Sequence, residues 1–124
     1  MDLERRKQVL EVTGKHGIPI FEDDCYADLR FEGEGVTSFH SLDDTGRVVY
    51  VGSFSKIIAP GMRMGYLVAP KDVIARAWSF KSGGAVSQFT ALTIAEFMKG
   101  NINRHIEEQN QALIAKRGAP ALEA

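Results

Sequence analysis

The sequence has one cysteine, Cys25, among 124 residues, which excludes an intrachain disulfide and a cysteine-rich zinc site. It has no excess of charge of one sign: 15 Lys and Arg stand against 16 Asp and Glu. This balance gives no general electrostatic attraction to nucleic acid or to an anionic membrane. No apolar run approaches the roughly 20 residues needed to cross a bilayer, and the charged first residues do not lead into a signal peptide. We therefore expect a cytoplasmic protein with no membrane and no nucleic-acid partner.

Several motifs are missing as well. The sequence contains no internal repeat and no long linker, which suits one ordinary domain. The three histidines are scattered without metal-binding spacing, so no metal site is expected. The phosphate-binding pattern G-x-x-x-x-G-K-[ST] does not occur. This absence argues against a nucleotide hydrolase that would bind a metal ion through the acids at 22–24.

Hydrophobic patterning predicts an α/β chain with about three strands and flanking helices. Three short apolar runs have strand character, at residues 18–21, 47–51 and 64–69. Helical patterns cover residues 2–16, 71–81, 86–99 and 102–117, and glycines separate them. Residues 27–46 are predicted to be mostly loop or short helix, and the glycine and proline at 118 and 120 to end the last helix. Trp78 and Phe80 are interpreted as helix packing positions.

Reactive polar residues follow the first two strands. In open α/β sheets, ligands bind beyond the carboxyl ends of the strands. If the two strands run parallel in one sheet, these residues share one crevice, and a Pro-Gly turn brings a later arginine back to it. The predicted site residues are Asp23, Tyr26, Ser53, Ser55, Lys56 and Arg63.

Pyridoxal 5'-phosphate requires this combination of groups. Its aldehyde forms a Schiff base with a lysine amine, and its pyridine nitrogen needs a carboxylate to stay protonated. Its phosphate needs hydroxyl and backbone donors and an arginine, which binds phosphate bidentately. A phenol near the ring oxygen can tune the electronics of the Schiff base.

Two segments resemble a known family. Residues 18–26 (IPIFEDDCY) and 51–66 (VGSFSKIIAPGMRMGY) are similar to class I/II aminotransferases of the fold-type I pyridoxal-phosphate superfamily, in the branch of aminoadipate, kynurenine and aromatic aminotransferases. The string S-F-S-K-x-x-x-P-G-x-R-x-G is the specific part, because it fixes a lysine, hydroxyls, a turn and an arginine in one register. The resemblance implies transfer of an amino group between an amino acid and a 2-oxo acid.

The resemblance also implies a role for each site residue. Lys56 would be the catalytic residue, which forms the Schiff base and moves the proton between the substrate α-carbon and the cofactor. Asp23 would pair with the pyridinium nitrogen, and Tyr26 would donate to the ring oxygen. Ser53 and Arg63 would hold the phosphate, and Ser55 lies beside the lysine in the cofactor-binding motif.

Family members are several times longer than 124 residues. The resemblance places residues 1–124 in a mainly parallel large domain, without its N-terminal part and without the C-terminal small domain. The missing parts carry a glycine-containing phosphate loop, a ring-stacking aromatic residue and a carboxylate-binding arginine. We therefore expect the isolated chain neither to bind the cofactor tightly nor to transaminate, and the full-length protein to be a homodimer.

Other interpretations remain open. An aminotransferase-like domain can serve a regulator for ligand sensing or assembly without catalysis, and decarboxylases and lyases share the same fold and cofactor. A phosphoacceptor receiver domain has the right size, but it needs a phosphoacceptor aspartate at the end of a later apolar strand, and this sequence has none there. Asp24 can cap the segment that follows it, and Ser53 can be an ordinary turn hydroxyl. Cys25 has no neighbouring histidine in sequence to activate it as a nucleophile.

Overall fold

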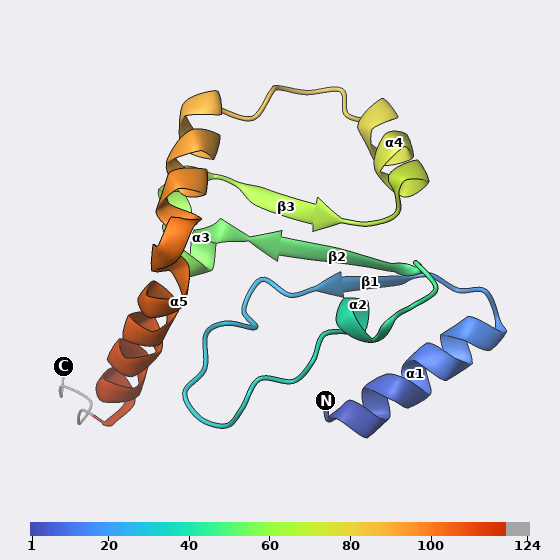
Figure 1. Cartoon of the computed structure of the whole chain (residues 1–124), viewed down its shortest axis with the longest axis horizontal. Coiled ribbons are helices and arrows are strands. Elements are labelled where there is room, and N and C mark those ends of the chain that lie inside the picture. Colours follow the sequence, from blue (N-terminus) through green and yellow to red (C-terminus); the bar gives the residue numbers. More distant parts are fainter. Residues whose placement is uncertain (119–124) are drawn as a thin grey trace, which may run out of the picture.

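The computed structural model describes residues 1–118 and contains one sheet of three strands in the order β1-β2-β3. Strand β1 (Ile20–Asp23) pairs parallel to β2 (Val48–Ser53), and β2 pairs antiparallel to β3 (Gly65–Val68). Figure 1 shows the ends of β1 and β2 and the beginning of β3 at the same edge of the sheet. The α/β class and the number of strands are confirmed.

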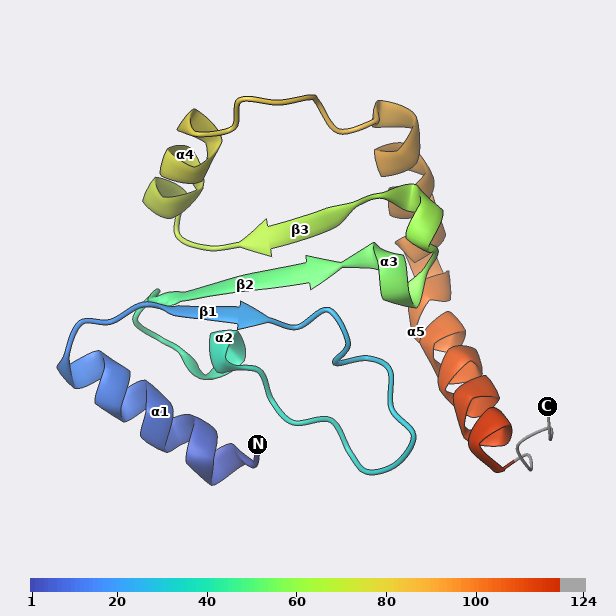
Figure 2. The same ribbon diagram turned by 180° about the vertical axis from the view of Figure 1, so that it is seen from behind.

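Helices lie around this sheet at both ends of the strands (Figures 1 and 2). The long ones are α1 (Leu3–Lys15), α4 (Lys71–Ser79) and α5 (Gln88–Gly118). The short ones are α2 (Phe39–Leu42), α3 (Phe54–Ile57) and the 3-10 turn η1 (Pro60–Met62). The glycine predicted to separate the last two helices does so: the backbone of α5 is non-helical at Lys99 and at Gly100, which has a left-handed φ of 82°. The predicted break at Pro120 lies outside the described residues.

A small apolar core holds α3 against α5. Phe54 and Ile57 of α3 and Ile94 of α5 are buried together, and Leu29, Ile58, Met62, Met64 and Ile102 pack against them. Burial of such side chains contributes roughly 1.5–3 kcal/mol each. Because α3 follows β2 directly, this core fixes the segment that begins at the end of β2.

Other apolar side chains remain open to solvent. Trp78 and Phe80 are 70% and 82% exposed, so their interpretation as packing positions is wrong for the described chain. Phe21, on β1, is 72% exposed. A helical pattern of apolar residues identifies side chains that favour burial, but it does not show whether a partner surface is present. Lys81 places its Nζ 5.1 Å from the Trp78 ring centroid, which gives that ring one cation–π contact.

Asp43 organises the turn before β2. Its Oδ2 accepts hydrogen bonds from the backbone N–H groups of Arg47 at 2.6 Å and Val48 at 2.9 Å, and Thr45 donates to Oδ1. Burial alone would raise the pKa of this carboxyl, but the hydrogen bonds outweigh burial and lower the pKa to about 2. The ionised form therefore stabilises the folded chain.

Replacing Asp43 by Asn is expected to lower the free energy of unfolding by about 1 kcal/mol near pH 7, allowing for solvent screening. Because the folded pKa lies below the unfolded value of 3.8, this contribution is present above about pH 4 and is lost as the pH falls toward 2. Urea unfolding of both proteins from neutral to acidic pH measures it. A difference between the two proteins that is the same at every pH would contradict this account.

Candidate active site

The pairing of β1 with β2 places the predicted acid and lysine at one sheet edge. Asp23 is the register partner of Val51, so both strands end at that edge, as the parallel arrangement required. Ser53 is the last residue of β2, and α3, which carries Lys56, begins at the next position. The predicted condition for a shared crevice, two parallel strands in one sheet, is confirmed.

Arg63 lies at the same edge because β3 returns directly from it. Gly65 pairs with Ser53, and the backbone N–H of Phe54 donates to the carbonyl of Met64 at 3.0 Å. Arg63 is exposed and adopts the left-handed region with φ 49°. Its side chain donates to the carbonyl of Pro60 at 3.5 Å. This weak bond leaves most donors of the guanidinium available for a ligand.

Lys56 and Tyr26 are brought together from segments 30 residues apart in the sequence. The Nζ of Lys56 lies over the Tyr26 ring, 5.5 Å from its centroid. Both residues are exposed, and 63% of Tyr26 is open to solvent. An amine and a phenol therefore face the same space.

The thiol of Cys25 is influenced by the charges of two site residues, Asp23 and Lys56. The backbone N–H of Cys25 donates to the carboxylate of exposed Asp23 at 3.4 Å. A hydrogen bond to Asp23, burial and the negative charge of Asp23 raise the pKa of the Cys25 thiol, while the charge of Lys56 opposes the shift. The thiol is thus within electrostatic range of both Asp23 and Lys56. Since nucleophilic cysteines need a lowered pKa, Cys25 is not activated here.

The two serines lie at the start of α3. The Oγ of Ser53 accepts a hydrogen bond of 3.2 Å from the backbone N–H of Ser55, so the turn role considered for Ser53 is present. This role does not exclude ligand binding, because a hydroxyl that accepts a bond still has its own proton to donate.

Asn110 fixes the loop that follows Tyr26, a role that was not predicted. Its Oδ1 accepts from the backbone N–H of Arg30 and its Nδ2 donates to the carbonyl of Asp28, both at 2.9 Å. Partners about 80 residues apart leave no local pattern to detect. Through this contact α5 holds the loop close to the site.

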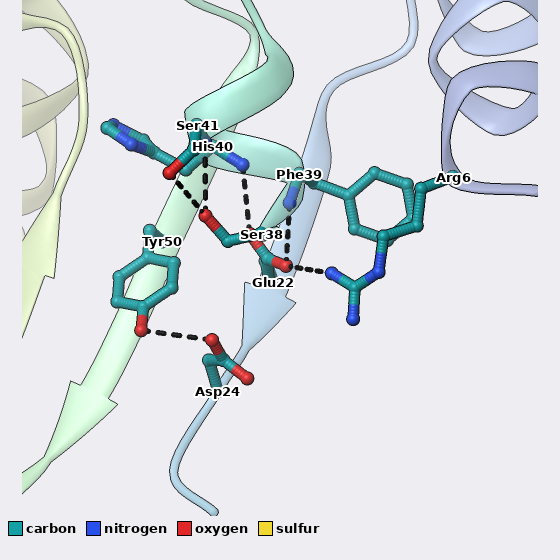
Figure 3. Close-up of polar contacts among 8 residues, drawn as sticks. All are labelled: Arg6, Glu22, Asp24, Ser38, Phe39, His40, Ser41 and Tyr50. Carbon is teal, nitrogen blue, oxygen red and sulfur yellow. Dashed lines mark hydrogen bonds and ion pairs between the residues drawn. The ribbon is translucent and has the colours of Figure 1, made fainter. Parts of the chain in front are cut away.

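The three acids at the end of β1 have different environments, and Figure 3 shows two of them, Glu22 and Asp24. Glu22 is only 7% exposed and bonds to Arg6 and to the first residues of α2. Asp24 accepts a hydrogen bond of 3.0 Å from the hydroxyl of Tyr50. Asp23 is the one of the three that stays exposed. The alternation of side chains along a strand was the sequence signal that could have separated them.

Two kinds of feature are absent from residues 1–118. No group of three or more His, Cys, Asp and Glu side chains is placed to hold a metal ion there. No helix in that range is both long and apolar enough to cross a membrane.

Comparison with known proteins identifies close relatives. An uncharacterised aminotransferase of Saccharolobus solfataricus is 40% identical over 97 residues, which are 74% of this chain and 24% of that protein. The uncharacterised HTH-type transcriptional regulator YisV of Bacillus subtilis is 34% identical over 96% of this chain and 25% of its own length. The chain thus spans about a quarter of the length of these relatives.

A solved structure shares the fold. The kynurenine aminotransferase of Pyrococcus horikoshii, in complex with PMP, superposes with a TM-score of 0.84 at 32% identity, over 90% of this chain and 28% of that one. The family model described as aminotransferase class I and II matches residues 1–119. This match covers nearly every residue, including both strand ends that carry the candidate site, and the chain belongs to the class I and II aminotransferase family.

Proposed function

We propose that this chain forms the cofactor-binding part of a pyridoxal-phosphate-dependent aminotransferase, which transfers an amino group between an amino acid and a 2-oxo acid. The observation that carries the proposal is the placement of Lys56. It follows β2 at the edge where β1 ends in Asp23, and its amine lies over the ring of Tyr26.

The chemistry of the side chains fits this cofactor. Among the side chains of residues 1–116, Lys56, Arg63 and Asp23 form no ion pair with one another or with other residues. Opposite charges that gather at one edge without neutralising each other suit a ligand that carries both an anionic phosphate and a cationic ring. Their exposure leaves them accessible to such a ligand.

Each residue then has a defined task. Asp23 would hold the protonated ring nitrogen, Tyr26 would donate to the ring oxygen, and Lys56 would supply the amine and move the proton at the substrate α-carbon. The phosphate would be held by Ser53 and Arg63, and Ser55 would lie beside the lysine in the cofactor-binding motif. When bound, the cofactor supplies an electron sink that stabilises negative charge at the substrate α-carbon.

The wider assignments are also proposals. We infer that residues 1–124 form part of a large domain, that the full-length protein is a cytoplasmic homodimer in amino-acid metabolism, and that it acts without a metal ion. The absence of a nucleic-acid partner stays a prediction, and the HTH-type regulators among the relatives are the reason to test it.

A second candidate function is ligand sensing by a regulator. It is favoured by relatives named as HTH-type transcriptional regulators, of which one is 34% identical over 96% of this chain. The same side chains would hold the cofactor in that case. Formation of a 2-oxo acid from an amino acid supports the aminotransferase. A cofactor whose spectrum responds to amino acids without release of a 2-oxo acid supports the sensor. Release of carbon dioxide from the amino acid supports a decarboxylase.

Borohydride trapping tests the proposal directly. The protein expressed from the complete reading frame is incubated with pyridoxal phosphate, reduced with borohydride, digested and mapped. We expect the reduced label on Lys56, and we expect Lys71, an exposed lysine at the start of α4, to remain unlabelled. Absence of label, or a label spread over several exposed lysines, would refute the proposed function.

A further inference from the structure

Three consecutive acids lie at the end of β1, and the fold must determine which of them presents its carboxylate to the ligand. Each of Glu22, Asp23 and Asp24 could offer a carboxylate at this sheet edge, and a slip of one residue would exchange the two faces. Alternation places Glu22 and Asp24 on one face and Asp23 on the other. Tyr50 confirms this placement, because it is the register partner of Glu22 and bonds to Asp24. Some interaction must select this arrangement.

Glu22 is held by both of its oxygens (Figure 3). Its Oε1 accepts from Arg6 Nη1 at 2.8 Å and from the backbone N–H of Phe39 at 2.9 Å, and its Oε2 accepts from the backbone N–H of His40 at 3.0 Å. The Arg6 guanidinium also lies over the Phe39 ring, 5.0 Å from its centroid. Since a buried carboxylate must keep its partners, Glu22 cannot leave this face without loss of all three bonds.

Asp24 is held on the same face by β2. Its carboxylate accepts from the Tyr50 hydroxyl at 3.0 Å, and its backbone N–H donates to the carbonyl of Val51 at 3.0 Å. Burial of Tyr50, followed by its bond to Asp24, raises the pKa of the phenol. The hydroxyl therefore stays protonated and continues to donate at neutral pH.

We propose that Glu22 and Asp24, with their partners Arg6 and Tyr50, form a strand-end clamp whose function is to turn Asp23 toward the cofactor ring nitrogen. The clamp binds the carboxylates on either side of Asp23 and leaves Asp23 exposed, with its carboxylate accepting a hydrogen bond from the backbone N–H of Cys25. These are positioning residues, since they act through Asp23. The inference rests on the proposed function, because it assigns a ligand to Asp23.

Two variants and a matched control test the clamp in the protein from the complete reading frame. Glu22→Gln removes the charge that Arg6 and two backbone donors share, and Tyr50→Phe removes one hydrogen bond to Asp24. Asp43→Asn is the control, because Asp43 also binds backbone N–H groups but lies before β2, at the opposite end of the sheet. The measurements are the pyridoxal phosphate affinity, the pH at which its bound absorption band changes, and hydrogen exchange of the Asp24 amide.

We expect Glu22→Gln to weaken the affinity about tenfold and Tyr50→Phe about threefold, as for lost hydrogen bonds to charged groups. Both should shift the pH of the absorption change and speed exchange at Asp24. Asp43→Asn should lower thermal stability while it leaves all three readings near wild type. A general loss of stability would affect these three readings in Asp43→Asn as much as in Glu22→Gln and Tyr50→Phe.

The outcomes separate the inference from the proposed function. If the wild type is trapped at Lys56, and the two variants show faster exchange at Asp24 but unchanged affinity and absorption, the inference alone is overturned. Unchanged exchange in Glu22→Gln also overturns it, because the strand end would then not depend on the clamp. A wild type that traps no cofactor at Lys56 overturns the proposed function and, with it, the assignment of a ligand to Asp23.

Discussion

In the protein expressed from the complete reading frame, replacing Lys56 by alanine is expected to lower transamination by roughly a thousandfold or more and to abolish borohydride trapping. Under the proposed function, the variant would lose both the amine that reacts with the cofactor aldehyde and the base that moves the proton, and general acid–base catalysis alone is worth about 10²–10⁴-fold. Lys56 is exposed, and among residues 1–116 its side chain forms no hydrogen bond or ion pair and only contacts the Tyr26 ring, so its removal should leave stability near wild type. Amino-acid-dependent formation of a 2-oxo acid measures the loss.

Two controls give this result its meaning. Lys56→Arg keeps the positive charge but cannot form a Schiff base, so it should be as inactive as the alanine variant. Lys71→Ala removes an exposed lysine outside the site and should retain full activity. Substantial turnover by Lys56→Arg would show that the charge of residue 56, and not its reactive amine, is what the protein needs.

Replacing Gly65 by alanine is expected to lower the free energy of unfolding by about 2–3 kcal/mol, the scale of overpacking in a tight site. A Cβ at this position would lie 2.8 Å from the backbone carbonyl oxygen of Gly52 on β2. A backbone atom cannot rotate away, so β3 must separate from β2 at the end that carries Arg63. Chemical denaturation measures the stability, and phosphate binding should weaken as well.

Gly61 provides the matched control for Gly65. It lies in the same motif, in η1, and a Cβ there would meet no atom within 4 Å. Gly61→Ala should therefore change stability by no more than about 0.5 kcal/mol. Equal losses in the two variants would mean that the motif requires glycine for a reason other than the close approach of β2 and β3.

Much of the fold could be predicted because apolar runs mark the strands. The first strand begins two residues later than its apolar run, at Ile20, because Pro19 has no N–H to donate to a neighbouring strand. The antiparallel direction of β3 follows from the short connection after Ser53, since a parallel crossover needs a dozen or more residues. The environment of Trp78 could not be predicted, because burial depends on surfaces distant in sequence.

The residues predicted for the site lie together in the fold, whereas the contacts that support them were not predicted. Asp23, Ser53, Lys56 and Arg63 lie at one sheet edge, and Tyr26 contacts Lys56. Their binding roles remain predictions. The sequence did not indicate that Glu22 is buried or that Asn110 fixes the loop after Tyr26, because both depend on partners from other elements. Residue type and spacing suggest reactive groups, whereas the contacts that orient them appear only in the folded chain.

The mixed sheet also sets an order of assembly. Ser53 and its partner Gly65 are 12 positions apart in the sequence, whereas Asp23 and its partner Val51 are 28 positions apart. Each doubling of loop length adds about 0.6 kcal/mol to the entropic free-energy cost of loop closure. We therefore expect the hairpin of β2 and β3, which carries the amine and the guanidinium, to close first. The carboxylate joins later, across the longer crossover. Lys56 and Arg63 are thus expected to come together as one local unit, and Asp23 to join them when β1 pairs with β2.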